Sequence, residues 1–292
     1  MIKMHDYIRV TTLEDFEQAV ASVDGPVMIL AGGSDVLVKA RETDAYRDHT
    51  FIDVFGIPAL RTIEEQGDEV IIRACATHED IAASPLVKRY MPILAEASRS
   101  VGSLQIRQHA TIGGNIANAS PAADTLAALA LLRAEVVILR DGVMRVEPLV
   151  DIFERPYKTN LSDRDLIVSV RIQKLGPNVQ YDFTKIGRRK ALSISRMTIA
   201  TLLEMDDDGV VTFFDMTMGA TFPRPMTFPD ISAMLVGKRP TDRDIQAVAR
   251  ALSDKIPEIA GIRKSTAYKQ PVCRNLAERI LRKLIKGETD DH

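Results

Sequence analysis

Two glycine-rich stretches hold the residues of this sequence that are best suited to chemistry. They are Ala31-Gly32-Gly33-Ser34-Asp35 and Thr111-Ile112-Gly113-Gly114-Asn115. A glycine pair after a buried strand lets the backbone turn with positive φ and brings bare N–H groups close to a ligand. Successive amides in such a turn form a concave anion site, and a serine hydroxyl adds one more donor. Phosphate is the natural ligand, and the alternative is that each pair is merely a tight turn.

Several other kinds of site are excluded because their motifs are missing. The sequence has no GxGxxG motif before a helix, no GxxxxGK[ST], no GxSxG and no HExxH, and its five histidines form no cluster. Cys75 and Cys273 lie far apart and belong to no CxxC, so zinc and iron–sulfur sites are not expected on this chain. Any redox chemistry would need an organic cofactor.

The composition is that of a soluble globular protein of about two domains. The 292 residues are 46% hydrophobic, and domains average about 150 residues. Lys and Arg number 38 against 40 Asp and Glu, which leaves a formal charge of -2 and no broad basic field for nucleic acid or an anionic membrane. The first ten residues lack the apolar core of a signal peptide, so we expect a cytoplasmic protein without membrane insertion.

The elements that position the first glycine-rich stretch form a small unit of helix and strands. Apolar residues at helical spacing predict a helix from Leu13 to Val23, with Thr11 or Thr12 as its cap. Short apolar runs predict strands at 27–31 and 51–54.

The second glycine-rich stretch lies in a different setting. Strands are predicted at 70–72, 136–139 and 167–172, and the helical region 82–94 is interrupted by Pro85 and Pro92. Residues 102–124 are rich in Gly, Ser, Asn and Ala and show little periodicity, which is typical of a long functional connection. A helix from Asp124 to Leu132 follows, and residues 175–178 are the best linker candidate.

After this linker the pattern changes to strands followed by helices. Residues 199–205 and 210–216 flank Asp206-Asp207-Asp208-Gly209 and predict a β-hairpin. Apolar residues at helical spacing then predict a helix over 245–256 after Thr241 and a final helix over 272–284. This order suggests a separate α+β domain.

Taken together, three segments resemble a known family. Ile29–Val38, Gln105–Arg107 and Thr111–Ile116 strongly resemble the FAD-binding (medium) subunit of the molybdenum-containing hydroxylases, which include xanthine dehydrogenase, carbon monoxide dehydrogenase and nicotinate dehydrogenase. The resemblance extends over essentially the whole chain, including 183–189. It implies an α+β fold, in which a PCMH-type FAD-binding domain of two α/β lobes (1–56 and 57–175) precedes a C-terminal α+β domain with an antiparallel sheet (176–292).

The resemblance also implies where FAD binds. In the family, the loop matching 29–36 wraps the pyrophosphate with backbone amides, and the stretch matching 110–115 forms the second wall. Asp124 matches a carboxylate that hydrogen-bonds the cofactor, although the residue alone suggests a helix N-cap. The cofactor-binding residues expected from the family are Ile29, Leu30, Ala31, Gly32, Gly33, Ser34, Asp35, Val36, Val101, Ala110, Thr111, Gly113, Gly114, Asn115, Asp124, Ile167, Lys185 and Ile194.

Four of these positions concern the flavin ring. Ile167 and Lys185 match positions near the ring, where a lysine would stabilise the anionic reduced flavin. Ile194 matches a side chain that covers the ring, with strand core as the alternative, and Val101 replaces an aromatic residue of the animal enzymes that stacks on the adenine or on the ring. For Arg188, Arg189 and Lys190 a solvated basic strand end is the simpler interpretation.

The function implied by the resemblance is electron transfer by FAD within a complex. An iron–sulfur subunit would deliver electrons from a molybdopterin-binding large subunit, and NAD⁺ or another carrier would accept them, in a dimer of heterotrimers. No residue of this chain is assigned a catalytic role, because the flavin carries the chemistry, and no metal is expected here. The alternatives are a stand-alone PCMH-type flavoprotein reductase or oxidase and a non-catalytic scaffold subunit.

Overall fold

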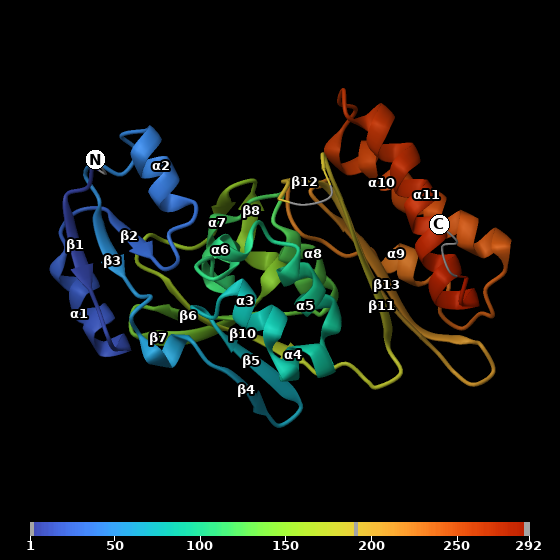
Figure 1. The fold of residues 1–292 in the computed structure, drawn as a ribbon, viewed down its shortest axis with the longest axis horizontal. Coiled ribbons are helices and arrows are strands. Elements are labelled where there is room, and N and C mark those ends of the chain that lie inside the picture. The colour runs from blue at the N-terminus through green and yellow to red at the C-terminus, as the bar shows by residue number, and fades with distance from the viewer. Residues whose placement is uncertain (1–2, 190–191, 289–292) are drawn as a thin grey trace.

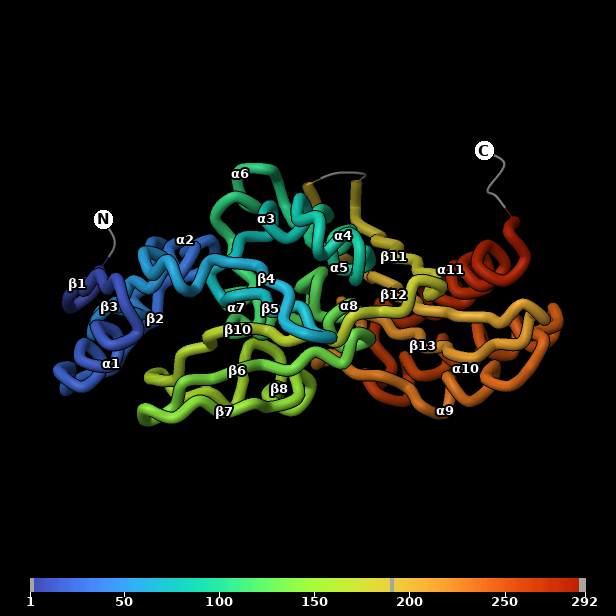
Figure 2. Tube along the Cα trace, turned by 90° about the horizontal axis from the view of Figure 1, so that it is seen from below, coloured from blue at the N-terminus to red at the C-terminus, as the bar shows by residue number. Residues whose placement is uncertain are grey.

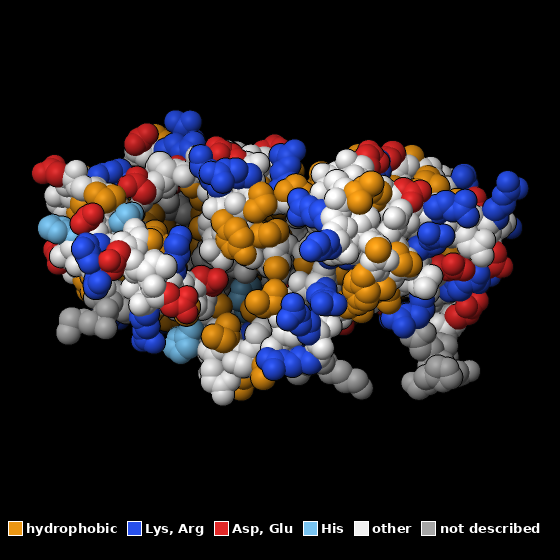
Figure 3. Space-filling view, turned by 90° about the horizontal axis from the view of Figure 1, so that it is seen from above, with side chains coloured by type: hydrophobic (Ala, Val, Ile, Leu, Met, Phe, Trp, Pro, Cys, Tyr) orange, Lys and Arg blue, Asp and Glu red, His pale blue; other side chains and the backbone are white. Residues whose placement is uncertain are grey.

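Three main sheets follow one another along the chain and lie side by side in sequence order (Figure 1 and Figure 2). The computed structural model describes residues 3–189 and 192–288. None of the helices in this described part is long and apolar enough to cross a membrane. On the face seen in Figure 3, basic and acidic side chains both occur along the whole length of the molecule.

The first unit is a parallel sheet with strand order β1-β3-β2. Its elements are β1 (Asp6–Arg9), α1 (Leu13–Ser22), β2 (Val27–Leu30), α2 (Val36–Glu42) and β3 (Thr50–Asp53). The predicted helix and both strands are confirmed, and Thr12 rather than Thr11 is the cap, since its hydroxyl accepts from the Asp15 amide. The sequence analysis missed β1 because its side chains are mostly exposed and lack an apolar run.

The second unit is built on an antiparallel sheet with strand order β4-β5-β10-β6-β7. Pro85 and Pro92 each occupy a first helical position, where a missing N–H does no harm, so the predicted interruptions are confirmed. The elements are η1 (Pro58–Leu60), β4 (Ile63–Gln66), β5 (Glu69–Arg73), α3 (His78–Ala83), α4 (Pro85–Tyr90), α5 (Pro92–Arg99), α6 (Leu104–Arg107), α7 (Ile112–Asn118), α8 (Asp124–Leu131), β6 (Glu135–Arg140), β7 (Val143–Pro148), η2 (Leu149–Ile152), β8 (Phe153–Arg155), β9 (Lys158–Thr159) and β10 (Leu166–Gln173).

The prediction of a long irregular connection over 102–124 is wrong, because this segment contains α6 and α7. The second glycine pair lies inside the first turn of α7 rather than in a turn with positive φ. Thr111 caps this helix, and the side chains of Ile112 and Ile116, on its inner face, are fully buried. Capping and burial therefore stabilise a helix whose glycines disfavour it.

The third unit is an antiparallel sheet with strand order β11-β12-β13, covered by helices. The predicted hairpin is confirmed as β12 and β13, and Gly209 supplies the left-handed residue of its turn, with φ 75°. Both predicted helices are confirmed, and Thr241 caps the first. The elements are β11 (Gln180–Gly187), β12 (Ser195–Met205), β13 (Val211–Gly219), α9 (Pro229–Ser232), α10 (Asp242–Ala260) and α11 (Thr266–Lys286).

Helix α8 joins the second unit to the third. Alternate side chains of β12 serve two cores: Ala200 and Leu202 pack in the core that contains α8, whereas Ile199 and Leu203 pack with α10 and α11. Figure 1 shows α8 on one side of this sheet and the two long helices on the other. The first residue of α8, Asp124, therefore lies where the two units meet.

Candidate functional site

The first glycine-rich loop, residues 31–35, connects β2 to α2 at the carboxyl edge of the parallel sheet. Gly33 has φ 69°, as the sequence predicts for this turn. Among the residues that the structure describes, none of the amide N–H groups of residues 31–36 has a protein acceptor. Such a run of unused donors ahead of a helix is suited to a phosphate. The Ser34 hydroxyl, in contrast, donates to the Asp35 carboxylate at 3.1 Å.

Gly32 is required for a different reason. A Cβ at this position would lie 1.8 Å from the carbonyl oxygen of His109. The loop therefore touches the backbone just before α7, and only glycine permits this approach.

The amides of the second glycine-rich stretch are used by the protein itself. The Gly113 amide donates to the Ala74 carbonyl at 2.9 Å, and the Gly114 amide donates to the Thr111 hydroxyl at 3.1 Å. The Asn115 amide donates to the Thr111 carbonyl. This stretch thus offers a bare, exposed surface at Gly114 rather than a set of free donors.

Side-chain hydrogen bonds connect the first loop to the N-terminus of α8. Asn118, on α7, donates to the Asp35 carboxylate at 3.1 Å. One turn earlier, the Asn115 side-chain carbonyl accepts from the Thr125 hydroxyl at 2.7 Å. Thr125 follows Asp124 on α8, and Asp124 in turn contacts the third unit. These hydrogen bonds, together with helix α7 between them, therefore form a continuous path from the first unit to the third.

At the end of this path a buried carboxylate meets an ammonium group and a hydroxyl. Lys185, on β11, donates to Asp124 at 2.6 Å and to the carbonyl oxygen of Ser100 at 2.8 Å. Ser195, on β12, donates to the other Asp124 oxygen. The side chains of Asp124 and Lys185 are only 8% and 16% exposed.

The start of α8 tests one of the two interpretations of Asp124. The N-cap of α8 is Ala123, so the N-cap interpretation of Asp124 is wrong. Burial raises the pKa of the Asp124 carboxyl above its ordinary value, whereas the charge and hydrogen bond of Lys185 and the hydroxyls of Ser195 and Ser100 oppose this rise. Lys185 and Asp124 thus form a short, mostly buried contact between the second and third units.

Three other predicted positions are buried to different degrees. Ala110 is buried, and its carbonyl accepts from the His78 amide at 3.0 Å. Val101 is half-buried, and its carbonyl accepts from Arg107 at 3.4 Å. Ile167, on β10, is 5% exposed and belongs to the core under α7.

The segment before β12 is mostly exposed. Ile194 is 80% exposed, so its alternative interpretation as strand core is wrong. Arg188 and Arg189 are exposed, as expected for a solvated basic strand end, and Arg189 donates to the Leu192 carbonyl at 3.1 Å. Lys190 lies outside the described residues.

Sequence reasoning missed Asn118, Thr125 and Ser195. Asn118 lies shortly after the second glycine-rich stretch, and Thr125 directly follows Asp124. Their closeness in sequence to predicted site residues could have indicated them. Ser195 offered none, because its contact with Asp124 depends on how two distant units pack.

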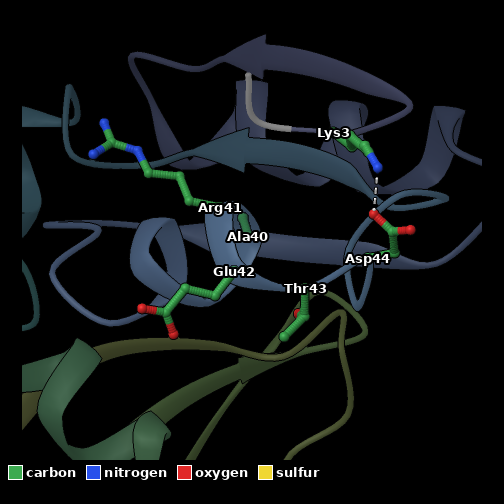
Figure 4. A pocket seen from close by; sticks show the side chains of 6 residues that line it. All are labelled: Lys3, Ala40, Arg41, Glu42, Thr43 and Asp44. Carbon is green, nitrogen blue, oxygen red and sulfur yellow. Dashed lines mark hydrogen bonds and ion pairs between the residues drawn. The ribbon is translucent and has the colours of Figure 1, made fainter.

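A separate surface recess of about 320 Å³ lies at the other end of α2 (Figure 4). The Lys3 ammonium bridges to Asp44 at 2.8 Å along its wall. The loop before α2 is not part of its lining, which consists of Lys3, Ala40, Arg41, Glu42, Thr43 and Asp44. In the described ranges, no group of three His, Cys, Asp or Glu side chains could hold a metal ion.

Comparison with known proteins identifies both parts of the chain. Residues 2–174 match the FAD binding domain in molybdopterin dehydrogenase, and residues 182–284 match the CO dehydrogenase flavoprotein C-terminal domain. The nicotinate dehydrogenase FAD-subunit of Eubacterium barkeri is 30% identical over 85% of this chain and 84% of its own length. The carbon monoxide dehydrogenase medium chain of Hydrogenophaga pseudoflava is 27% identical over 87% of each chain.

Solved structures share the whole fold. Reconstituted CO dehydrogenase from Oligotropha carboxidovorans superposes with a TM-score of 0.88 at 23% identity, covering 99% of this chain and 100% of that chain. A carbon monoxide dehydrogenase from Hydrogenophaga pseudoflava superposes with a TM-score of 0.87 at 24% identity, covering 96% of each. The predicted fold class is therefore confirmed.

Proposed function

Because the chain belongs to the family of FAD-binding subunits of the molybdenum hydroxylases, we propose that it passes electrons from iron–sulfur clusters on a partner subunit to NAD⁺ or another acceptor. Its cofactor is FAD, and the chain acts as an FAD-dependent oxidoreductase subunit of a complex. When bound, FAD supplies the conversion between one-electron and two-electron chemistry.

The unused amides of residues 31–36 are the observation that carries this proposal. They fit the two phosphates of a dinucleotide, which need several donors at once. The bare surface at Gly114 would face the same phosphates and the ribityl chain without a side chain in the way. We assign the pyrophosphate to this place, between the first and second units.

The flavin ring is assigned to the other end of the path, beside Lys185 and Asp124. An ammonium group has three N–H donors, and within the described residues Lys185 uses two of them. The third would donate to a carbonyl oxygen of the ring. Ile194 is exposed enough to cover the ring, whereas Val101 and Ile167 would contribute apolar contacts without aromatic stacking.

The role of this chain's own residues is to bind, orient and tune the cofactor. The Lys185 ammonium would stabilise negative charge that develops on the ring, but the Asp124 carboxylate offsets part of its field. The Lys185 effect is therefore that of an oriented ion pair, weaker than that of an isolated cation. No acid–base pair of this chain is needed for the transfer.

The partners follow from the named relatives. These include the medium chain of a carbon monoxide dehydrogenase, a name that implies further chains in the same complex. We propose an iron–sulfur small subunit and a molybdopterin-binding large subunit as partners here, in a dimer of heterotrimers located in the cytoplasm.

The experiment is to purify the full chain alone and together with those two subunits. The chain alone should be yellow and release FAD on denaturation, and its flavin should be reduced by the substrate of the complex only when both partners are present. Reduction of the isolated chain by a small substrate would support a stand-alone flavoprotein, and a colourless chain that takes up no FAD would support a scaffold. Adding NAD⁺ to the reduced complex then tests the acceptor.

A further inference from the structure

We propose that Ser195 is a positioning residue, which fixes the Asp124 carboxylate and, through it, the Lys185 ammonium beside the flavin. This inference rests on the proposed function, because it needs FAD at this end of the site. Ser195 donates to one oxygen of Asp124, and Lys185 donates to the other.

An irregularity in the backbone of β12 directs the Ser195 side chain towards Asp124 on α8. The pairing of β11 with β12 shifts register here, since Ile186 faces Met197 whereas Gly187 faces Ser195. Arg196 is the extra residue of this bulge, and it is exposed while its neighbours Ser195 and Met197 are buried. Bulges commonly redirect side chains next to functional sites.

The hydroxyl holds the carboxylate in one orientation. Asp124 is 7% exposed, so water does not readily replace a lost donor. Without Ser195, the Asp124 carboxylate would keep only the Ser100 hydroxyl beside Lys185, and rotation of the carboxylate would move the oxygen that holds Lys185. Its negative charge would also be less well compensated, which disfavours electrons on a nearby ring.

The same chain contains a second serine that bonds a buried aspartate away from this path. Ser232, at the end of α9, donates to Asp215 at 3.2 Å, and Asp215 is 1% exposed. Burial raises the pKa of this Asp215 carboxyl too. Ser232→Ala is therefore a matched control for the general effect of removing a hydroxyl from a buried carboxylate.

The experiment compares Ser195→Ala, Ser195→Thr and Ser232→Ala in the full chain loaded with FAD. The measured quantities are the FAD dissociation constant, the flavin midpoint potential and the urea midpoint. We expect Ser195→Ala to weaken FAD binding about tenfold and to lower the potential, because one charge-linked hydrogen bond is lost. Ser195→Thr, which keeps the hydroxyl, should restore both values, and Ser232→Ala should change the urea midpoint only.

The outcomes separate the two proposals. If the wild-type chain takes up no FAD, the proposed function fails and this inference fails with it. If the wild type holds FAD, but Ser195→Ala leaves the affinity and potential unchanged, or alters them no more than Ser232→Ala does, Ser195 is only a structural contact. Failure of Ser195→Thr to restore the potential would also overturn the positioning role.

Discussion

Gly32 and Gly33 are adjacent, but the structure requires glycine at each for a different reason. Gly32 lies against the His109 backbone, where a Cβ has no room. Gly33 has φ 69°, a conformation that costs other residues about 1–2 kcal/mol. A substitution at Gly32 thus disrupts the contact between two units, whereas a substitution at Gly33 tests the turn that presents the free amides.

We expect Gly33→Ala to weaken FAD binding at least about tenfold. The added Cβ meets the Leu37 side chain at 2.8 Å and strains the turn, so the donor amides move away from the phosphates. The control is Gly67→Ala in the β4–β5 turn, where φ is 59° and a Cβ meets nothing within 4 Å. Gly33→Ala should lose at least as much stability in urea as Gly67→Ala, but only Gly33→Ala should release FAD; equal FAD retention would refute the pyrophosphate assignment.

His78 should make the folded chain sensitive to acid. Burial lowers its pKa to about 4 from an ordinary 6.5, with a further contribution from the positive charge of Arg107. The folded state therefore binds this proton less readily than the unfolded state, and stability falls as the pH drops from 6.5 towards 4. The full loss is about 3 kcal/mol, from about 1.4 kcal/mol per pKa unit.

Urea unfolding at pH 7 and pH 4.5 measures this effect. His78→Leu should reduce the difference in stability between the two pH values, whereas substitution of the exposed His5 by Leu should leave it as in the wild type. Identical pH dependence in all three proteins would show that His78 does not titrate as its burial demands.

Among the elements, helices with a strong apolar period were predicted well and glycine-rich ones were not. Helices α1 and α10 have capping threonines and regular apolar spacing, which local sequence reveals. The sequence of helix α7 predicts a loop, because Gly113, Gly114 and Asn115 disfavour a helix. The helix forms because it packs against Ala74, a tertiary contact that local sequence does not reveal. The two glycine-rich segments therefore lie close together, as the predicted site requires, although the second is built as a helix and not as a turn.

Thr111 should be important for both the stability of α7 and the binding of FAD. Thr111→Ala removes the acceptor of the Gly114 amide and should cost about 1 kcal/mol in unfolding free energy. Because α7 carries Asn115 and Asn118, fraying of its first turn should also weaken FAD binding.

Thr241→Ala is the control, since the Thr241 hydroxyl accepts from the third amide of α10 as Thr111 does for α7, although Asp244 also bonds back to Thr241. It should show a similar loss of stability with unchanged FAD affinity, and Thr111→Ser should behave as the wild type. If Thr111→Ala loses stability but holds FAD as tightly as Thr241→Ala does, α7 does not form a wall of the site.

For the whole molecule, the decisive feature is that the proposed site draws on all three units. The loop of the first unit, helix α7 of the second and strand β11 of the third each contribute. Sequence motifs revealed the first two and the resemblance supplied Lys185, but no local pattern predicts that Asp124 and Lys185 form an ion pair. That contact arises only when α8 packs on the C-terminal sheet.

This ion pair should couple the stability of the interface to the flavin potential. Lys185→Met alone leaves the buried Asp124 carboxylate unpaired and should cost about 3 kcal/mol or more in unfolding free energy. The double variant Asp124→Asn/Lys185→Met removes both charges and should recover most of that loss. Its flavin potential should nevertheless stay below that of the wild type, because the ammonium donor to the reduced ring is missing.

Urea unfolding and potentiometric titration of the single and double variants measure the two effects separately. A double variant no more stable than Lys185→Met would mean that the pair does not hold the interface, and one with a wild-type potential would remove Lys185 from the surroundings of the ring.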